Sequence, residues 1–343
     1  MSETLVSLPI VIPLAAAFAA LLLRQYARIQ GLFTLAALLV SLLASLLLLL
    51  QVQAEGAMVM QLGSWPVPFG ITLVGDMLSA FMVVMCQLVL VMGALYAVGA
   101  KDKCIRYPSF YPLFLTLAAG LTGAMLTGDA FNLFVFAELL VISGAALTAM
   151  SDDRLGIEAA YKYFYISLAA AWFLLLAVGS LYVSYGTLNM ADLALRVAAD
   201  PDRPLLAFAI IMLFAAFMVK SAVVPFHFWQ PDFHTVSPTA VSAMLSSIVV
   251  KLGIYGFLRM TTLLFVEQAV WIRGVLIVLG VVGVLLGGYS AIGTHNAKRM
   301  LAYSTLAQIG FILVAIGWGT PLSLAAALIF AFNHSLIKSA LLM

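Results

Sequence analysis

Eleven apolar stretches dominate this sequence, and each is close to the length of about 20 residues that a helix needs to cross a bilayer. Of the 343 residues, 65% are hydrophobic and only 9% are charged, which is more apolar surface than a soluble domain buries. The sequence therefore predicts an all-α polytopic membrane protein with about eleven transmembrane helices. The stretches lie at 4–23, 29–51, 75–99, 108–127, 130–150, 159–184, 204–222, 238–260, 269–291, 299–318 and 321–343.

Two segments between these stretches are not expected to cross. Residues 53–74 are interrupted by Gly and Pro and are expected to form a short extramembrane hairpin. Residues 187–203 are expected to form a short amphipathic helix on the surface, which ends before a proline. The first stretch follows Ser2 and Glu3 rather than basic residues, which indicates a retained first span and not a cleaved signal peptide.

Lysine and arginine in the loops predict the orientation. The odd-numbered loops hold nine such residues: Arg24, Arg28, Lys101, Lys103, Arg106, Arg154, Lys162, Lys298 and Arg299. The even-numbered loops hold four: Arg196, Arg203, Arg259 and Arg273. Because the more basic side faces the cytoplasm, the N-terminus is expected outside.

Five ionisable residues lie well inside the apolar stretches: Glu138, Lys220, Lys251, His334 and Lys338. A charged group at the bilayer centre costs about 2.5–3.5 kcal/mol on insertion scales. Such groups face the bundle interior or a hydrated cavity, and they commonly carry ions or protons. We therefore treat these five residues as the candidate site.

Lys220 ends an apolar helix five residues before Pro225. Proline cannot donate the backbone hydrogen bond that a continuing helix needs, so the span is expected to end or break just after Lys220. Broken helices beside water form ion sites in transporters, and a lysine with a movable carboxylate partner can load and release a proton there. The alternative is a lysine that snorkels to the interface, with residues 226–229 as an aromatic belt.

Lys251 lies near the middle of its span, where snorkelling is hardest. Ser246, Ser247, Gly253 and Gly256 surround it in the sequence and allow close helix packing or water. We expect a buried proton carrier, and an unreactive buried lysine is the alternative.

Glu138 lies about two turns inside a helix whose N-terminus is marked by Asp129 and Asn132. A purely structural ion pair with a neighbouring helix is the alternative to a role in proton movement.

His334 and Lys338 are spaced i, i+4 and therefore share one helix face, and Asn333 is expected beside them as a third polar group. Histidine titrates near neutral pH and suits a proton relay. A helix–helix hydrogen-bond cluster is the alternative.

His227 and His234 flank the broken segment, with Asp232 as the nearby carboxylate. These three residues are candidates for a proton entrance, and capping of a loop is the alternative. No cysteine or acidic set completes a metal site around them, so no metal is expected.

No cofactor is expected in this chain. The sequence has no GxxxxGK[ST] loop, no GxGxxG in a βαβ context and no CxxC, the motifs typical of nucleotide, flavin, haem or iron–sulfur sites. Cys86 and Cys104 are spaced neither for a disulfide framework nor for zinc. The basic residues are scattered, which argues against a nucleic-acid partner.

Four stretches of the sequence resemble the antiporter-like subunits of complex I and its relatives. They are LTGDAFNLFVFAELLVISGAALT (126–148), VKSAVVPFHFWQPDFHTVSPTAVSAMLSSIVVKLGIYGFLRM (219–260), NAKRMLAYSTLAQIGFIL (296–313) and FNHSLIKSALL (332–342). Together they place most of residues 75–343 in this family. The TGD-x-FNLFVF-x-E form is most similar to the D component of Mrp-type sodium/proton antiporters, whereas PFHFWQPDFHT is closer to hydrogenase-type and other complex-I-like branches.

The resemblance implies a fold of about fourteen helices, in which two inverted five-helix repeats each contain one broken helix, here helix 7. It implies that Glu138 and Lys220 form a modulating ion pair and that Lys251 is the central proton carrier. His334 and Lys338 then form the onward relay. The implied division is 1–107 for the first three helices and the hairpin, 108–260 for the first repeat, and 261–343 for part of the second.

The family carries a further Lys or Glu on the broken helix of the second repeat, at a position that falls beyond Met343. The sequence contains neither that position nor the rest of the repeat, and its last span runs to Met343 without a polar flank. We therefore expect an incomplete exit half-channel and a truncated or split subunit.

The resemblance implies a proton-conducting subunit of a multisubunit sodium/proton antiporter in the plasma membrane of a bacterium or archaeon. Its expected partners are other membrane subunits, protons, sodium ions and bilayer lipid. Two alternatives stay open. One is a proton-pumping subunit of a redox complex of the hydrogenase or NADH-quinone oxidoreductase type, and the other is an inactive scaffold.

Overall fold

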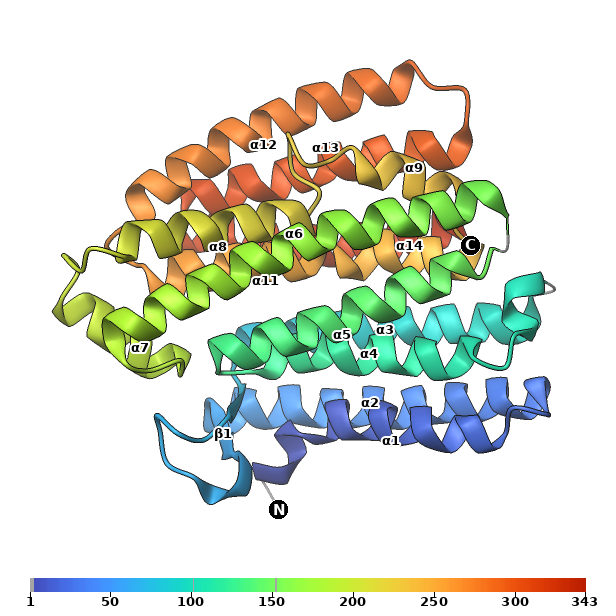
Figure 1. Cartoon of the computed structure of the whole chain (residues 1–343), viewed down its shortest axis with the longest axis horizontal. Coiled ribbons are helices and arrows are strands. Elements are labelled where there is room, and N and C mark those ends of the chain that lie inside the picture. The colour runs from blue at the N-terminus through green and yellow to red at the C-terminus, as the bar shows by residue number, and fades with distance from the viewer. Residues whose placement is uncertain (1–2, 101, 152) are drawn as a thin grey trace. The chain divides into compact units, whose positions relative to one another are not determined.

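The structure is a computed structural model that describes residues 3–100, 102–151 and 153–343, so Ser2 and Lys101 lie outside the described residues. Figure 1 shows a chain built almost entirely of helices, as predicted. Among the described residues, eight helices are long and apolar enough to cross a membrane, and three shorter apolar helices occupy the remaining expected stretches.

Every predicted stretch therefore coincides with a helix. These are α1 (Leu8–Leu22), α2 (Ala27–Glu55), α3 (Met77–Gly99), α4 (Phe110–Leu126), α5 (Ala130–Ala149), α6 (Arg154–Tyr185), α8 (Leu206–Lys220), the helix Thr239–Leu264, α12 (Ala269–Ile292), α13 (Ala297–Trp318) and α14 (Pro321–Leu342). Short 3-10 turns lie at Glu3–Val6 (η1), Leu62–Ser64 (η2) and Lys103–Arg106 (η3).

The two segments that were not expected to cross have the predicted structures. Strands β1 (Met58–Gln61) and β2 (Thr72–Gly75) pair antiparallel, with Met58 opposite Gly75, and form the hairpin. The surface segment forms helix α7 (Met190–Ala199), which begins after Asn189. The Asn189 side chain accepts hydrogen bonds from the backbone N–H groups of Ala191 and Asp192, both at 3.1 Å, and so caps the helix.

Contacts between loops support an alternating path of full crossings. Leu73 of the hairpin bridges to Thr127 in the fourth loop, and both belong to even-numbered loops. Near the first loop, Gln30 donates to the backbone oxygen of Pro108, which ends the third loop. Arg299 follows the ninth loop and pairs with Asp232, which follows the break, at 3.4 Å. In each of these contacts, an odd-numbered loop meets an odd-numbered loop or an even-numbered loop meets an even-numbered one. This is the pattern expected if every helix crosses the membrane once, so that odd and even loops lie on opposite sides.

The chain divides into two compact units. The first runs to Phe164 and includes Ser237–Met244, and the second comprises Tyr165–Val236 and Leu245–Leu342. In the first unit α4 packs on α5, where a β-carbon added at Gly120 would lie 2.8 Å from the backbone nitrogen of Leu140. The three-part division that the resemblance implies is based on the repeats of the fold and not on contacts between residues. The two compact units therefore do not test it, and it stays a prediction.

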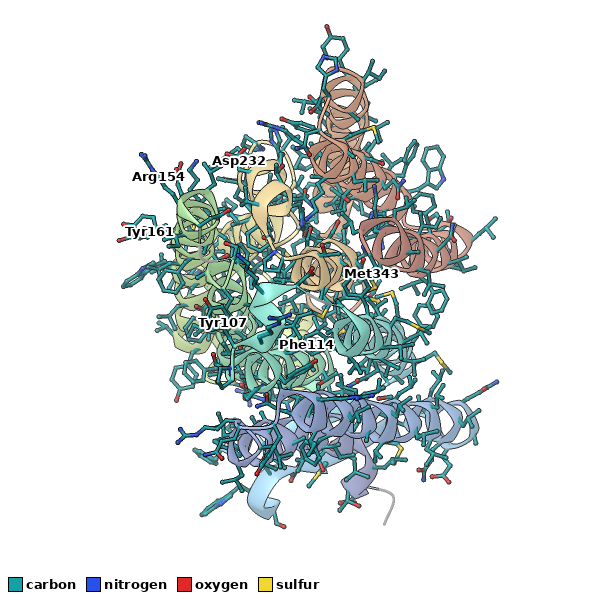
Figure 2. All side chains as sticks on the ribbon, turned by 90° about the vertical axis from the view of Figure 1, so that its right-hand side faces the viewer. Tyr107, Phe114, Arg154, Tyr161, Asp232 and Met343 are labelled. Carbon is teal, nitrogen blue, oxygen red and sulfur yellow. The ribbon has the colours of Figure 1, made fainter. Side chains whose placement is uncertain are left out.

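The first turns of α6 present polar and aromatic side chains to the surroundings. Figure 2 shows Arg154 and Tyr161 pointing away from the ribbon, and Tyr161 is 59% exposed. Lys162 pairs with Glu158 at 2.8 Å on the same exposed surface. Aromatic and basic side chains gather at membrane interfaces, so this end of α6 is suited to the headgroup level.

Helices α12 and α13 run side by side in the second unit (Figure 1). Their backbones approach closely because glycines face one another, as in many membrane helix pairs. A β-carbon added at Gly310 would lie 2.5 Å from the Gly280 oxygen and 2.8 Å from the Val284 nitrogen. Backbone atoms cannot move aside as a flexible side chain does.

Gly310→Ala is therefore expected to lower the stability of the purified protein by about 1–3 kcal/mol, the usual effect of overpacking. The matched control is Gly288→Ala on α12, where an added β-carbon meets nothing within 4 Å. Thermal unfolding in one detergent measures both variants. Equal melting temperatures for the two would show that this glycine contact does not hold α12 and α13 together.

Candidate functional site

The centre of the site is a contact between two buried ionisable side chains in the second unit. Lys251 begins helix α11 (Lys251–Arg259) and is fully buried, and His334 on α14 is 1% exposed. The Lys251 Nζ atom hydrogen-bonds the His334 Nδ1 atom. A buried ammonium group needs an acceptor, and a neutral imidazole nitrogen supplies one. The prediction that Lys251 is buried in mid-span is therefore confirmed.

A widened helical turn precedes Lys251. The span Thr239–Leu264 consists of α10 (Thr239–Met244), the π-helical turn η4 (Leu245–Val249), α11 and a second π-helical turn η5 (Met260–Leu264). Within η4 the Ser247 carbonyl accepts a hydrogen bond from the Ser335 hydroxyl of α14 at 2.8 Å. Single π-helical turns occur frequently at functional sites, and this one ties the Lys251 helix to the His334 helix.

One face of α14 is polar and buried. His334 and Lys338 share it, as the i, i+4 spacing predicted, and each is 1% exposed. The third polar group beside them is Ser335, which is fully buried. The expectation for Asn333 was wrong, because Asn333 is exposed. Asn333 lies about 140° around the helix from Lys338, whereas Ser335 lies only about 60° from it, so Ser335 rather than Asn333 falls on the face that His334 and Lys338 share.

A chain of hydrogen bonds runs from Lys338 to the helix that carries Lys251. The Lys338 Nζ atom donates to the Leu301 carbonyl at 2.9 Å, and the Thr305 hydroxyl donates to the same carbonyl at 3.0 Å. Thr305 is also 3.0 Å from the hydroxyl of Ser246. Three helices thus share one buried polar network. Thr305 and Ser335 were not among the predicted site residues, although hydroxyl residues in apolar spans offered a weak signal.

Two buried polar atoms next to Lys251 have no protein hydrogen-bond partner within the described residues. They are the His334 Nε2 atom and the Ser247 hydroxyl oxygen. Buried polar groups of this kind are commonly satisfied by ordered water. The Nε2 atom is the second ring nitrogen of a histidine whose Nδ1 atom already faces a lysine, so the imidazole has one occupied side and one available side.

Lys220 lies at the helix break, as predicted. It is the last residue of α8 and is 8% exposed, and after it the chain turns until α9 (Trp229–Val236) begins. The break is a Schellman cap: Val223 N–H bonds the Met218 carbonyl at 2.9 Å, and Ala222 N–H bonds the Val219 carbonyl at 3.1 Å. A lysine in the last turn of a helix also meets the negative end of the helix dipole.

The break in α8 is packed directly against the Lys251 helix. A β-carbon added at Gly253 would lie 1.9 Å from the Ser221 hydroxyl oxygen and 2.5 Å from the Phe217 carbonyl. One at Gly256 would enter the Phe217 ring. The two glycines therefore permit the close helix packing that the sequence predicted around Lys251.

Glu138 lies on α5 in the first unit and is half-buried. The helix begins where predicted, since the Asp129 carboxylate accepts from the Asn132 backbone N–H at 2.8 Å. The Asn132 side chain donates to the Thr127 hydroxyl at 3.0 Å, which fixes the turn before the helix. The pairing of Glu138 with Lys220 stays a prediction.

The three candidate entrance residues lie at different depths. Asp232, labelled in Figure 2, lies on α9 with 42% of its side chain exposed and pairs with Arg299. His234, two residues further along α9, is fully buried, and the positive charges of Lys338 and Lys298 act on it. His227 is half-buried in the turn before α9. The structure thus brings His234 within electrostatic range of the α14 lysine.

Within the described part of the chain, no group of three His, Cys, Asp or Glu residues is arranged to hold a metal ion. Both cysteines are buried free thiols, and Cys86 contacts the Met125 sulfur at 3.7 Å. In the second unit, hydrogen bonds through hydroxyl and carbonyl groups connect the Lys338 side chain to the helix that carries Lys251.

Comparisons with known proteins identify the family of the chain. Residues 127–343 match the family described as NADH:quinone oxidoreductase/Mrp antiporter, transmembrane. The D component of the Na(+)/H(+) antiporter of Alkalihalophilus pseudofirmus is 31% identical over 339 residues, which cover 99% of this chain and 69% of that protein. The N component of the NADH-quinone oxidoreductase of Desulforudis audaxviator is 37% identical over 351 residues, covering 99% of this chain and 69% of that protein.

The fold agrees as well. A chain in the solved Mrp complex from Dietzia sp. DQ12-45-1b superposes with a TM-score of 0.91 at 29% identity, covering 99% of this chain. This chain spans 63% of the Dietzia chain. The family match covers more than half of the sequence and includes every candidate site residue. The chain therefore belongs to the NADH:quinone oxidoreductase/Mrp antiporter transmembrane family.

Proposed function

We propose that this chain is a proton-conducting subunit of a multisubunit sodium/proton antiporter. The observation that carries the proposal is the fully buried hydrogen bond between Lys251 and His334, continued by Lys338 one turn along α14. Ionisable groups this deep in a membrane protein mark ion or proton pathways. The similarity to the D components of sodium/proton antiporters supports sodium as the coupled ion.

The proposed proton step uses the two nitrogens of His334. A protonated Lys251 donates to Nδ1, and transfer along that bond leaves a neutral amine and an imidazolium. The imidazolium then releases a proton from Nε2, the side that has no protein partner within the described residues. Lys338 lies one turn further on the same face and repels a second positive charge, which limits the lifetime of the imidazolium.

Glu138 and Lys220 are proposed as the modulating ion pair. Lys220 ends a helix whose following turn is not helical, so its ammonium group lies beside backbone that tolerates water. Separation of the pair exposes a positive charge near the Lys251 helix and favours loss of a proton there. Gly253 lets the end of α8 pack close to the Lys251 helix, so the Lys220 charge acts on Lys251 electrostatically.

Asp232, His234 and His227 are proposed as the proton entrance. The half-exposed Asp232–Arg299 pair lies at the surface, and the buried His234 lies two residues behind it on α9. Since His234 is within electrostatic range of Lys338, it connects the surface to the α14 end of the line.

His234→Gln is expected to slow cation-driven proton exchange by about 10-fold or more, because the amide cannot carry a proton. The matched control is His295→Gln, which changes an exposed loop histidine. Initial exchange rates in everted vesicles measure both. If the His234 variant is as fast as the control, protons enter by another route.

The function itself is tested with the whole gene cluster expressed in cells that lack their native antiporters. Everted vesicles are energised, and dissipation of the pH gradient is followed after addition of sodium, potassium or choline chloride. Sodium-dependent dissipation that disappears when this chain is omitted supports the proposal. Unchanged dissipation without this chain would leave it as an inactive scaffold.

A second candidate is a proton-pumping subunit of a redox-driven complex. It is favoured by the 37% identity to a component of an NADH-quinone oxidoreductase, and it assigns the same roles to the same residues. The two functions differ in what drives them. Proton uptake that follows oxidation of an electron donor without any cation gradient would establish the redox complex, and neighbouring genes for small Mrp-type membrane proteins would favour the antiporter.

The proposed setting is a multisubunit complex in the plasma membrane of a bacterium or archaeon, with the N-terminus outside. The bias of basic residues toward the odd-numbered loops supports this orientation. The structural similarity to a chain of an Mrp complex supports other membrane subunits as partners.

A further inference from the structure

An apolar cavity of about 380 Å³ lies in the second unit, away from the line of ionisable residues. One wall is the surface helix α7, and the other is the end of η5 with the start of the loop that follows it. Both walls belong to even-numbered loops and so lie on the same side of the membrane. The cavity has the size of a typical small-ligand site.

Helix α7 has two apolar faces rather than one. Met190, Leu193 and Val197 are buried against the protein. Ala191, Ala194, Leu195 and Ala198 follow the i, i+3, i+4, i+7 spacing of a second face, and this face lines the cavity. Leu195 remains 73% exposed there. Three alanines in this face keep the wall shallow, so the cavity is open where larger side chains would fill it.

Hydrogen-bond acceptors mark one end of the cavity. Glu267 and Gln268 line it together with Val266, and Glu267 is exposed. The Gln268 Oε1 atom is buried and has no hydrogen-bond partner among the described residues. A carboxylate and an unpartnered amide oxygen together favour a ligand group that is positively charged and donates N–H hydrogen bonds.

The two arginines nearest to helix α7 in the sequence, Arg196 and Arg203, are paired with carboxylates. Arg196 donates to Asp192 at 3.0 Å and to the Tyr185 carbonyl at 2.8 Å. The Arg196 hydrogen bond lowers the pKa of Asp192, so this pair stays ionised. Arg203 is 2.7 Å from the Asp200 carboxylate. The α7 segment therefore keeps the charges of its own arginines paired, and the exposed Glu267 carboxylate adds negative charge at the cavity.

We propose that the α7 cavity binds an acyl chain of a phospholipid whose headgroup carries a primary ammonium group, as in phosphatidylethanolamine. An amphipathic helix such as α7 lies at the level where headgroups meet acyl chains, so the cavity opens where such a lipid is present. The ammonium group donates to the Glu267 carboxylate and the Gln268 oxygen, and the chain fills the alanine-lined wall. A transmembrane helix is about 10–12 Å wide and fits this cavity less well than one acyl chain does.

The first test measures lipid retained by the complete complex after detergent washing, using quantitative mass spectrometry. Wild type is expected to retain about one ethanolamine phospholipid per chain. The Ala194→Trp variant is expected to lose this lipid, because the indole ring fills the cavity. The matched control is Leu285→Trp on α12, at a position that is 67% exposed and does not line the cavity. Equal retention by wild type and the Ala194 variant would overturn the proposal.

The second test addresses the headgroup and does not depend on the tryptophan variant. In nanodiscs of defined composition, wild type is expected to melt at a higher temperature with ethanolamine lipid than with choline lipid, whose quaternary nitrogen donates no N–H bond. Glu267→Gln is expected to remove most of this difference without changing the shape of the site. An equal melting temperature in both lipids, or a higher one in glycerol lipid, contradicts the ammonium assignment.

A third measurement separates lipid from a protein occupant. Leu195→Cys in native membranes is expected to form no cross-link to another subunit with a short bifunctional maleimide. An efficient cross-link to a second polypeptide would place a partner helix in the cavity and overturn the lipid assignment.

Discussion

Replacing Lys251 with alanine is expected to reduce cation-driven proton exchange at least about 100-fold while the complex stays assembled, because the central proton carrier is lost. Lys251 is fully buried, and its ammonium group faces His334 rather than a carboxylate. Removing a buried charge spares the protein a desolvation penalty, so the variant is not expected to unfold. Native gels and exchange assays on the same vesicles separate the two effects.

Two further substitutions distinguish a Lys251 that carries protons from a Lys251 that only supplies a structural charge. Lys251→Met keeps the bulk but has no titratable group, and Lys251→Arg keeps the charge but does not release its proton in proteins. Both are expected to be as inactive as the alanine variant. The control is Lys162→Met, since Lys162 is an exposed lysine with 46% of its side chain accessible. A fully active arginine variant would make Lys251 a structural charge.

Glu138→Gln is expected to have the second largest effect, with an exchange rate between those of the His234 and Lys251 variants and above the background of vesicles without the complex. The substitution preserves shape and removes one negative charge from a half-buried position on α5. A neutral amide cannot open and close an ion pair, so Lys220 is no longer switched between two states. The control is Glu158→Gln on α6, whose side chain is 50% exposed.

A double-mutant cycle tests whether Glu138 acts through Lys220. Glu138→Gln and Lys220→Met are measured singly and together. If the two residues form one switch, the double variant is expected to be no slower than the slower single variant, because residues that act as a unit are not additive. Fully multiplicative losses in assembled complexes would show that the two charges act independently.

The spans were predictable because the bilayer imposes length and hydrophobicity on each of them. All eleven stretches became helices, and the Gly- and Pro-rich segment became the hairpin. The break after Lys220 followed from Pro225. Its detailed geometry did not, since the turn places Ala222 at a φ of 53°, in the left-handed region. Alanine gives no sequence signal for that conformation, which glycine usually supplies.

The polar network was only partly predictable. Charged residues in a span stand out because they are costly there, and this singled out Lys251, His334 and Lys338. Thr305 and Ser335 were missed because a hydroxyl in a helix can bond its own i−4 carbonyl, so it needs no other partner. Asn333 was misassigned because adjacency in the sequence does not place two residues on one helix face, and Asn333 lies about 140° around the helix from Lys338.

The sequence by itself determined the membrane class, the approximate number and positions of the apolar helices, and the residues whose charge is costly in lipid, because each of these depends on local composition alone. Only the tertiary structure decided which of those charges meet. Lys251 and His334 are 83 residues apart, and their contact requires the π-helical turn before Lys251 and the carbonyl of Ser247 that holds α14 against it. Such pairing depends on how helices rotate and approach, and side chains distant in sequence set that geometry together.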